Sequence, residues 1–200
     1  YWSRSSPASL RTGQWTGGGW GGSFTVVGLP VTIPVPGVGG LNMTITLPPS
    51  FTDVERRDQG NGWEGNFGPG ESLLWTRNHD TGVLTLDFSS PIMGFGSQFQ
   101  RDSYVSFVAG IRAYDAGLNL LGSFTVTGNS TDAGDDSAIF IGVLSGLDDI
   151  SRIQLDADSA THDFAINGPR IQMIPEPATI WLLLGGGLVL VARALRHRKL

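Results

Sequence analysis

The residues best suited to binding a metal ion are the aspartates of one short loop, residues 131–136. Asp132, Asp135 and Asp136 stand close together there, beside a glycine. Carboxylate oxygens are hard ligands of the kind that Ca²⁺ prefers. The loop lacks the closing glutamate of a twelve-residue EF-hand, so a calcium site would have to be assembled across several loops. The alternative is that these aspartates form turns and keep the surface soluble; no cofactor other than calcium is indicated.

A second set of candidates consists of three tryptophans in glycine-rich surroundings, which are typical of loops. They are Trp15, Trp20 and Trp63. An exposed indole ring has a broad apolar face that can stack on a sugar, with a polar N–H at its edge. A tryptophan beside glycine in a β protein also commonly covers the edge of a core. Both interpretations stay open at this point.

Catalytic groups are present, but no set of them forms a recognisable motif. Glycosidase chemistry needs two carboxyls at a defined separation across a cleft, and a Ser-His-Asp triad needs defined geometry. Lys199 is the only lysine and lies at the C-terminal end, which excludes a P-loop or Schiff-base lysine in the body. We therefore expect that the protein is not an enzyme. The groups on which a hydrolase would depend are Glu55, Glu64, Glu71, His79-Asp80 and His162-Asp163.

Charge is distributed unevenly along the chain. The residues before Ala178 contain eighteen carboxylates and nine arginines, which gives them a net charge of −9. The tail carries four cations. A body this acidic repels phosphate groups, so nucleic acid is not an expected partner. The chain contains no cysteine, which excludes disulfides, thiolate metal sites and a cysteine nucleophile.

Short runs of alternating apolar and polar residues predict a succession of β-strands. Residues 41–47, LNMTITL, alternate at every position. Residues 105–113 and 118–127 form the clearest hairpin, turning at Asp115-Ala116-Gly117. The polar, glycine-rich stretch 53–70 lacks apolar periodicity and is predicted to be a long loop. Further strands are expected at 23–27, 31–38 (an edge strand or extended loop), 72–76 and 83–88 (joined as a hairpin), 91–100, 138–144, 150–155 and 164–173.

About ten short strands, with no amphipathic helix before Ala178, predict an all-β fold, an antiparallel β-sandwich. The expected organisation is a glycine-rich N-terminal segment (1–22), a β-sandwich ectodomain (23–173) and a C-terminal segment (174–200). About 175 residues precede that segment, which is enough for one domain with its own core. Residues 1–7 have neither the basic start nor the apolar region of an export signal, so we expect a fragment or a mature form.

The C-terminal segment predicts one transmembrane helix. Residues 178–192 carry no charge, and fifteen helical residues rise about 22 Å against a hydrocarbon core of roughly 30 Å. Including Leu195 and letting Arg193 extend toward the membrane surface completes a short span. Basic residues near a membrane-spanning end stay in the cytoplasm, so the body is expected outside it. The cations that fix this orientation are Arg193, Arg196, Arg198 and Lys199.

Three ordered parts of this segment resemble the PEP-CTERM sorting signal of exported bacterial proteins. Pro175-Glu176-Pro177-Ala178-Thr179 comes first, then the Leu/Gly-rich span, then the arginine-rich tail. The resemblance implies that a membrane-embedded exosortase cuts near Pro175, Glu176 and Pro177. The protein would rest in the inner membrane transiently, with its body outside the cytoplasm, and then reach the cell surface or the extracellular polysaccharide. A related glycine-rich sorting tail lacks Pro-Glu-Pro, and an uncleaved anchor remains the alternative.

From Gly94 onward the order of motifs resembles the jelly-roll, galactose-binding-like ectodomains that accompany this tail in many proteins. The motifs are GFGSQFQ, YDAGLNLLGSFTVTG, FIGVLSGLDDISRIQLDAD and FAINGPRI. Such domains often have an Ile-Asp pair in the last strand, whereas Ile166 is followed here by Asn167, so no carboxylate role is carried over. The function expected is that of a surface or matrix protein. The alternative is a carbohydrate-binding, lectin-like module, with or without Ca²⁺.

Overall fold

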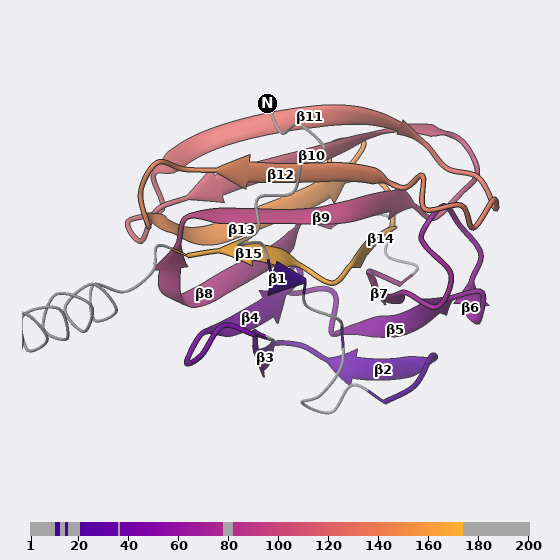
Figure 1. Cartoon of the computed structure of the whole chain (residues 1–200), viewed down its shortest axis with the longest axis horizontal. Coiled ribbons are helices and arrows are strands. Elements are labelled where there is room, and N and C mark those ends of the chain that lie inside the picture. Colours follow the sequence, from indigo (N-terminus) through magenta and orange to yellow (C-terminus); the bar gives the residue numbers. More distant parts are fainter. Residues whose placement is uncertain (1–10, 13–14, 16–20, 36, 78–81, 174–200) are drawn as a thin grey trace, which may run out of the picture.

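The computed structural model describes residues 11–12, 15, 21–35, 37–77 and 82–173. Several predicted features lie outside these residues: the transmembrane helix, the Pro175-Glu176-Pro177 motif, the basic tail, Trp20 and His79. The described strands pack in two layers that form a β-sandwich (Figure 1). The predicted all-β sandwich is therefore confirmed for the body of the chain. No helix in the described residues is both long enough and apolar enough to cross a bilayer.

The first layer is a nine-stranded sheet with β9 (Gly94–Arg101) near its centre. Two short strands, β14 (Phe164–Asn167) and β15 (Arg170–Gln172), pair with different parts of β9, and β12 (Ile139–Leu144) pairs along most of its length. The sheet continues from β14 through β7 (Ser72–Trp75) and β5 (Asp53–Gln59) to β2 (Thr25–Gly28). Its two shortest strands are β1 (Arg11–Thr12), which pairs with β15, and β6 (Gly62–Trp63), which runs parallel to β5.

The second layer is a six-stranded antiparallel sheet. Its order is β11 (Leu120–Asn129), β10 (Ser106–Tyr114), β13 (Ile150–Ala157), β8 (Leu84–Ile92), β4 (Asn42–Thr46) and β3 (Val31–Pro34). The β10–β11 hairpin keeps its register from Ser106↔Asn129 to Ala113↔Gly122, which confirms the strongest hairpin prediction. In β4 the inward side chains are buried and the others are not, as the alternating pattern predicts.

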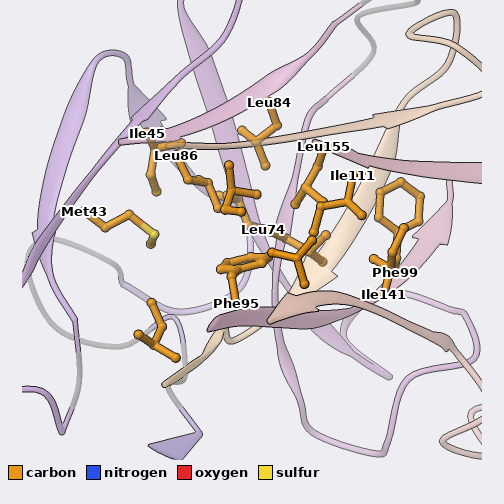
Figure 2. Close-up of a cluster of buried hydrophobic side chains, with 14 of the residues drawn as sticks. Met43, Ile45, Leu74, Leu84, Leu86, Phe95, Phe99, Ile111, Ile141 and Leu155 are labelled. Carbon is orange, nitrogen blue, oxygen red and sulfur yellow. The ribbon is translucent and has the colours of Figure 1, made fainter. Parts of the chain in front are cut away.

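The main core lies between the two sheets. Leu84, Leu86, Ile111 and Leu155 enter it from the six-stranded sheet, and Leu74, Phe95, Phe99 and Ile141 enter from the nine-stranded sheet (Figure 2). The ring of Phe99 stacks on Phe164 with centroids 4.4 Å apart and on Phe107 at 5.8 Å. Since the chain has no cysteine, this apolar packing, rather than disulfides, stabilises the body.

The prediction of a long loop over residues 53–70 is wrong, because β5 and β6 occupy much of it. β5 carries few apolar residues, but its charged side chains neutralise one another. Arg57 pairs with Glu55 at 2.9 Å, and Arg56 pairs with Asp58 at 2.9 Å. The strand is thus stabilised by ion pairs and by its neighbours β2 and β7, neither of which an apolar pattern reveals.

The predicted hairpin between residues 72–76 and 83–88 is also wrong. β7 lies in the nine-stranded sheet and β8 in the six-stranded sheet. The chain therefore crosses from one layer to the other at this point. Local turn residues do not distinguish a hairpin from such a crossing, because the choice depends on which sheet buries each strand.

Candidate functional site

A second, smaller apolar cluster lies on the outer face of the nine-stranded sheet, away from the main core. Side chains alternate along a strand, so Leu74 faces the main core while its neighbours Leu73 and Trp75 face outward. Two loops, residues 64–71 and 130–138, cover this outer face. The cluster consists of Trp63, Phe67, Leu73, Trp75, Ala138 and Ala165.

Gln100 on β9 holds the two loops to the sheet. Its Oε1 accepts hydrogen bonds from the backbone N–H of Asn66 at 2.8 Å and from Nε1 of Trp63 at 3.3 Å. Its Nε2 donates to Oδ1 of Asn66 at 3.1 Å and to the carbonyl oxygen of Thr131 at 3.0 Å. Gln100 is 1% exposed, so the contacts satisfy an amide that would be costly to bury alone.

Asn66 extends the same network outward. Its Nδ2 donates to Oγ1 of Thr131 at 2.6 Å and to Oγ of Ser137 at 2.9 Å, and its Oδ1 accepts from the N–H of Thr131 at 2.7 Å. Asp135 then accepts from both the N–H and the hydroxyl of Ser137. Such side-chain bonds to nearby backbone are the usual way that Asp and Ser shape a turn.

A parallel network lies beside the first on the same face. The buried Asn167 accepts from the backbone N–H of Gln98 and donates toward the carboxylate of Glu71. The side chain of Gln98 in turn donates to Oδ1 of Asp136 at 2.7 Å. The two networks make the loops a fixed part of the sheet surface.

An open groove of about 570 Å³ lies where this surface meets the β10–β11 hairpin. Six of its nine lining residues have a hydroxyl or amide side chain, and among the described lining residues Asp135 contributes the only charge. The groove could therefore hydrogen-bond an uncharged ligand rich in hydroxyl groups. Its lining consists of Asn66, Ser106, Thr127, Gly128, Asn129, Thr131, Asp135, Ser137 and Ile139.

Tyr104 precedes the lining residue Ser106 by two positions. It is 57% exposed, and its hydroxyl donates to the carbonyl oxygen of Glu64 at 3.0 Å. Partial desolvation and the carboxylates of Asp132, Glu64 and Asp102 raise the pKa of Tyr104, so it stays a neutral phenol at physiological pH. Burial likewise raises the pKa of Asp102, whereas the bonds from Ser137 lower the pKa of Asp135.

Two aspartates of the predicted calcium site accept hydrogen bonds from neighbouring side chains. Asp135 is used in a turn with Ser137, and Asp136 accepts from Gln98. In the part of the chain that the structure describes, no three His, Cys, Asp or Glu groups come together to hold a metal ion. The role of Asp132, Asp135 and Asp136 as Ca²⁺ ligands stays a prediction, and in the structure Asp135 and Asp136 bond to Ser137 and Gln98 beside the groove.

The stacking role is corrected for two of the three tryptophans. Trp15 is 1% exposed and lies in the main core, and Trp63 is 7% exposed and lies in the outer cluster. Neither ring is available to a sugar. Trp20 lies outside the described residues, so its predicted role stays a prediction.

The carboxylates considered for hydrolysis have structural partners. Glu55 pairs with Arg57 at 2.9 Å and with Arg77 at 3.2 Å. Glu71 accepts from the N–H of Gly68 at 3.1 Å and lies against Asn167. Glu64 is exposed and His162 is half-buried beside β14. These positions provide no observation that favours a catalytic pair.

Sequence reasoning did not find Gln98, Gln100 or Asn66. Gln98 and Gln100 alternate with Phe99 on β9, which places them on the face opposite the core. That pattern alone suggests exposed residues. What buries them is a pair of loops 31 to 38 positions away in sequence, and no local signal marks such a cover.

The site and fold together define an acidic β-sandwich domain with a polar, mostly uncharged groove. Residues 174–199 match the model of the PEP-CTERM protein-sorting motif. The chain thus carries a PEP-CTERM sorting motif, which supports an exported protein that is anchored transiently in the membrane and implies processing by exosortase. No curated protein matches the chain.

Solved structures with a similar arrangement of strands include three bacterial proteins of low sequence identity. A DUF4465 family protein from Bacteroides caccae is 12% identical, with a TM-score of 0.42, over 85% of this chain and 97% of that one. A Clostridium stercorarium protein solved in complex with cellobiose is 10% identical, with a TM-score of 0.36, over 78% and 99%. A xylan-binding domain from Paenibacillus barcinonensis is 9% identical, with a TM-score of 0.38, over 86% and 100%. Similarity at this level provides no residue correspondence for the groove.

Proposed function

We propose that the protein is a non-catalytic component of the cell surface or the extracellular polysaccharide matrix. The observation that carries the proposal is the sorting motif at residues 174–199, which begins directly after the last strand of the sandwich. β15 ends at Gln172 and is paired with β9. Cleavage near Pro175, Glu176 and Pro177 therefore removes the tail without cutting a strand, and a folded acidic domain is released.

The rest of the tail serves the same step. The apolar span holds the Pro-Glu-Pro region at the membrane surface, and Arg193, Arg196, Arg198 and Lys199 keep the C-terminus in the cytoplasm. Proline disfavours helix at its own position and at the one before it, and an extended peptide of this kind is what a processing enzyme can bind. An alternative is a permanent anchor that exosortase does not cut.

The intact mass of the protein tests the proposal. The full chain, preceded by an export signal, is expressed in a host with exosortase and in the same host without it. We expect loss of the residues after the Pro-Glu-Pro region only in the first host, and no loss for a Glu176→Ala variant there. A full-length mass in the membrane fraction of both hosts would replace the proposal with that of a permanent anchor.

A second candidate function, compatible with the first, is carbohydrate binding. It is supported by the groove, whose Ser, Thr and Asn side chains can exchange hydrogen bonds with sugar hydroxyls, and by the exposed Tyr104, two positions before the lining residue Ser106. The carboxylate of Asp135 would accept from hydroxyl groups but repel uronic acids. A neutral polysaccharide is the ligand that suits this lining best.

Binding to neutral and to anionic polysaccharides, measured by affinity electrophoresis of the full chain in mild detergent, tests the second candidate. Retardation by a neutral glycan that Asn129→Ala and Tyr104→Ala both weaken would support it. Leu147→Ala is the control, because Leu147 is 65% exposed and belongs to a loop outside the groove lining. Equal retardation of all four proteins, or none of the wild type by any glycan, would exclude the groove.

A further inference from the structure

β11 is a long strand at the edge of the six-stranded sheet. Its ten residues, Leu120–Asn129, pair with β10, and this is its only ladder among the described strands. Figure 1 shows β11 along the outer margin of the sandwich. The outer edge of such a strand presents backbone N–H and C=O groups that fit another extended strand.

Proteins usually protect such edges with short strands, prolines or charged side chains. The opposite edge of the same sheet follows this rule, since β3 has four residues and ends at Pro34. β11, with the sequence LLGSFTVTGN, has no proline and no charge. In fact no charged residue occurs between Asp115 and Asp132.

Several exposed side chains of β11 are apolar. Leu120 and Phe124 are each 56% exposed, and Val126 is 36% exposed. The pairing Ile111↔Phe124 and Ala109↔Val126 directs Phe124 and Val126 toward the core side of the sheet, since cross-strand partners share a face. Ile111 and Ala109 are fully buried, so the apolar face of the sheet continues past its covered part onto this edge.

We propose that β11 pairs antiparallel with β11 of a second copy of this chain, about a twofold axis at Phe124. The body of the chain is strongly acidic, so two copies repel each other wherever their charged surfaces meet. The uncharged stretch around β11 is where they can approach without that cost. A twofold contact uses the same patch on both copies, and the backbone edge of a strand is self-complementary in this sense.

The side chains fit this register. On the core-side face Phe124 meets its own copy, and Val126 lies opposite Gly122. The ring of Phe124 lies over Gly122 of the same strand, 3.2 Å and 3.6 Å from an added Cβ, so Val126 of the second copy would pack against this ring. On the other face Ser123 lies opposite Thr125, a pair that can share a hydrogen bond.

Cysteine cross-linking tests both the contact and its register, because the natural chain has no cysteine. Opposite residues in an antiparallel pair have Cα atoms about 4.5–5.5 Å apart, within the roughly 4.4–6.8 Å that a disulfide spans. We expect Phe124→Cys to form a disulfide-linked dimer of the full chain in mild detergent. A mixture of Ser123→Cys and Thr125→Cys should form the mixed dimer in preference to either self-linked one. Leu147→Cys, at an exposed loop residue, gives the background of random linkage within shared micelles.

Sedimentation of uncross-linked protein provides a second test. The wild type is expected to dimerise reversibly, and Phe124→Lys should weaken the dimer at least about tenfold, because it sets two cations against each other at the axis. Leu147→Lys should leave dimerisation unchanged, and circular dichroism should show the same β content in all three proteins. A wild type that stays monomeric at every concentration overturns the proposal, as does cross-linking of Phe124→Cys no stronger than that of Leu147→Cys. Neither result bears on cleavage of the tail.

Discussion

Oδ1 of Asn167 on β14 accepts a hydrogen bond of 2.9 Å from the backbone N–H of Gln98 on β9. The same side chain donates through Nδ2 to Oε1 of Gln98 and lies 3.3 Å and 3.4 Å from the two carboxylate oxygens of Glu71. An amide suits this position because it donates and accepts at once, whereas an ionised carboxylate only accepts. The structure thus gives a reason for asparagine at a position where similar domains often have aspartate.

Replacing Asn167 with aspartate should destabilise the fold by about 1–3 kcal/mol near neutral pH. The change removes the donor to Gln98 and Glu71 and places a second carboxylate next to that of Glu71. Repulsion between them raises the folded-state pKa of the new carboxyl, so the loss should shrink as the pH falls and the group takes up a proton. Urea unfolding at pH 7 and pH 4.5 measures this difference. Asn129→Asp, at an exposed position, should show little loss at either pH.

Gln100→Leu should cost about 1–3 kcal/mol for the polar groups that it leaves unpaired and should loosen the loops 64–71 and 130–138. The N–H of Asn66 and the carbonyl of Thr131 would lose their partners in a buried setting. Urea unfolding and amide hydrogen exchange in the two loops are the measurements. Gln154→Leu is the matched control, since Gln154 is only partly buried and bonds to side chains. Similar exchange rates in the two variants would show that Gln100 does not anchor the loops.

The strands that could be predicted from the sequence are those whose pattern is local. β4 and the β10–β11 hairpin follow from alternation and from a turn at Asp115. β5 could not be predicted in this way, because its arginines and acidic residues look like a solvated loop until Glu55, Arg57 and Arg77 are brought together. The layer to which β7 and β8 belong is likewise decided by long-range pairing.

The candidate site also combines features that have a local signal in the sequence with features that depend on long-range contacts. Alternation on β9 places Gln98 and Gln100 on the outer face, but only the folded chain brings Asn66 and Thr131 over them. The aspartates of residues 131–136 stand out in the sequence, but turn-forming and metal-binding aspartates have the same composition, so the sequence does not distinguish the two roles. Whether a carboxylate is already used by Ser137 depends on geometry.

Asp135 should stay ionised to a lower pH than an ordinary aspartate, because the hydroxyl and the backbone N–H of Ser137 bond to its charged form and lower its pKa. A carboxyl whose pKa is lower in the folded than in the unfolded protein stabilises the fold at pH values above its unfolded-state pKa. This stabilisation is lost as the pH falls through the folded-state pKa. Ser137→Ala removes the largest of these bonds, so the pKa of Asp135 should rise. Carboxyl chemical shifts followed by NMR titration measure the change.

Asp115 offers an internal control in the same titration. Its pKa is also lowered, by bonds from the side chain and backbone of Asn119, and it lies in the β10–β11 turn, away from Ser137. Asp115 should therefore keep its pKa in Ser137→Ala. A parallel rise at both aspartates would point to a general loss of structure instead of a lost hydrogen bond.

Trp15→Ala should destabilise the domain by about 3–5 kcal/mol, the usual loss for a buried aromatic side chain. Trp15 packs in the main core, and its Nε1 donates to the carbonyl oxygen of Ile166 at 3.2 Å. Trp15→Phe keeps most of the apolar contact and removes that bond, so it should cost only about 1 kcal/mol. Thermal and urea unfolding measure both losses, with Leu147→Ala as the exposed control. If Trp15→Ala unfolded like the wild type, Trp15 would not be part of the core, and its ring would again be a candidate for stacking on a sugar.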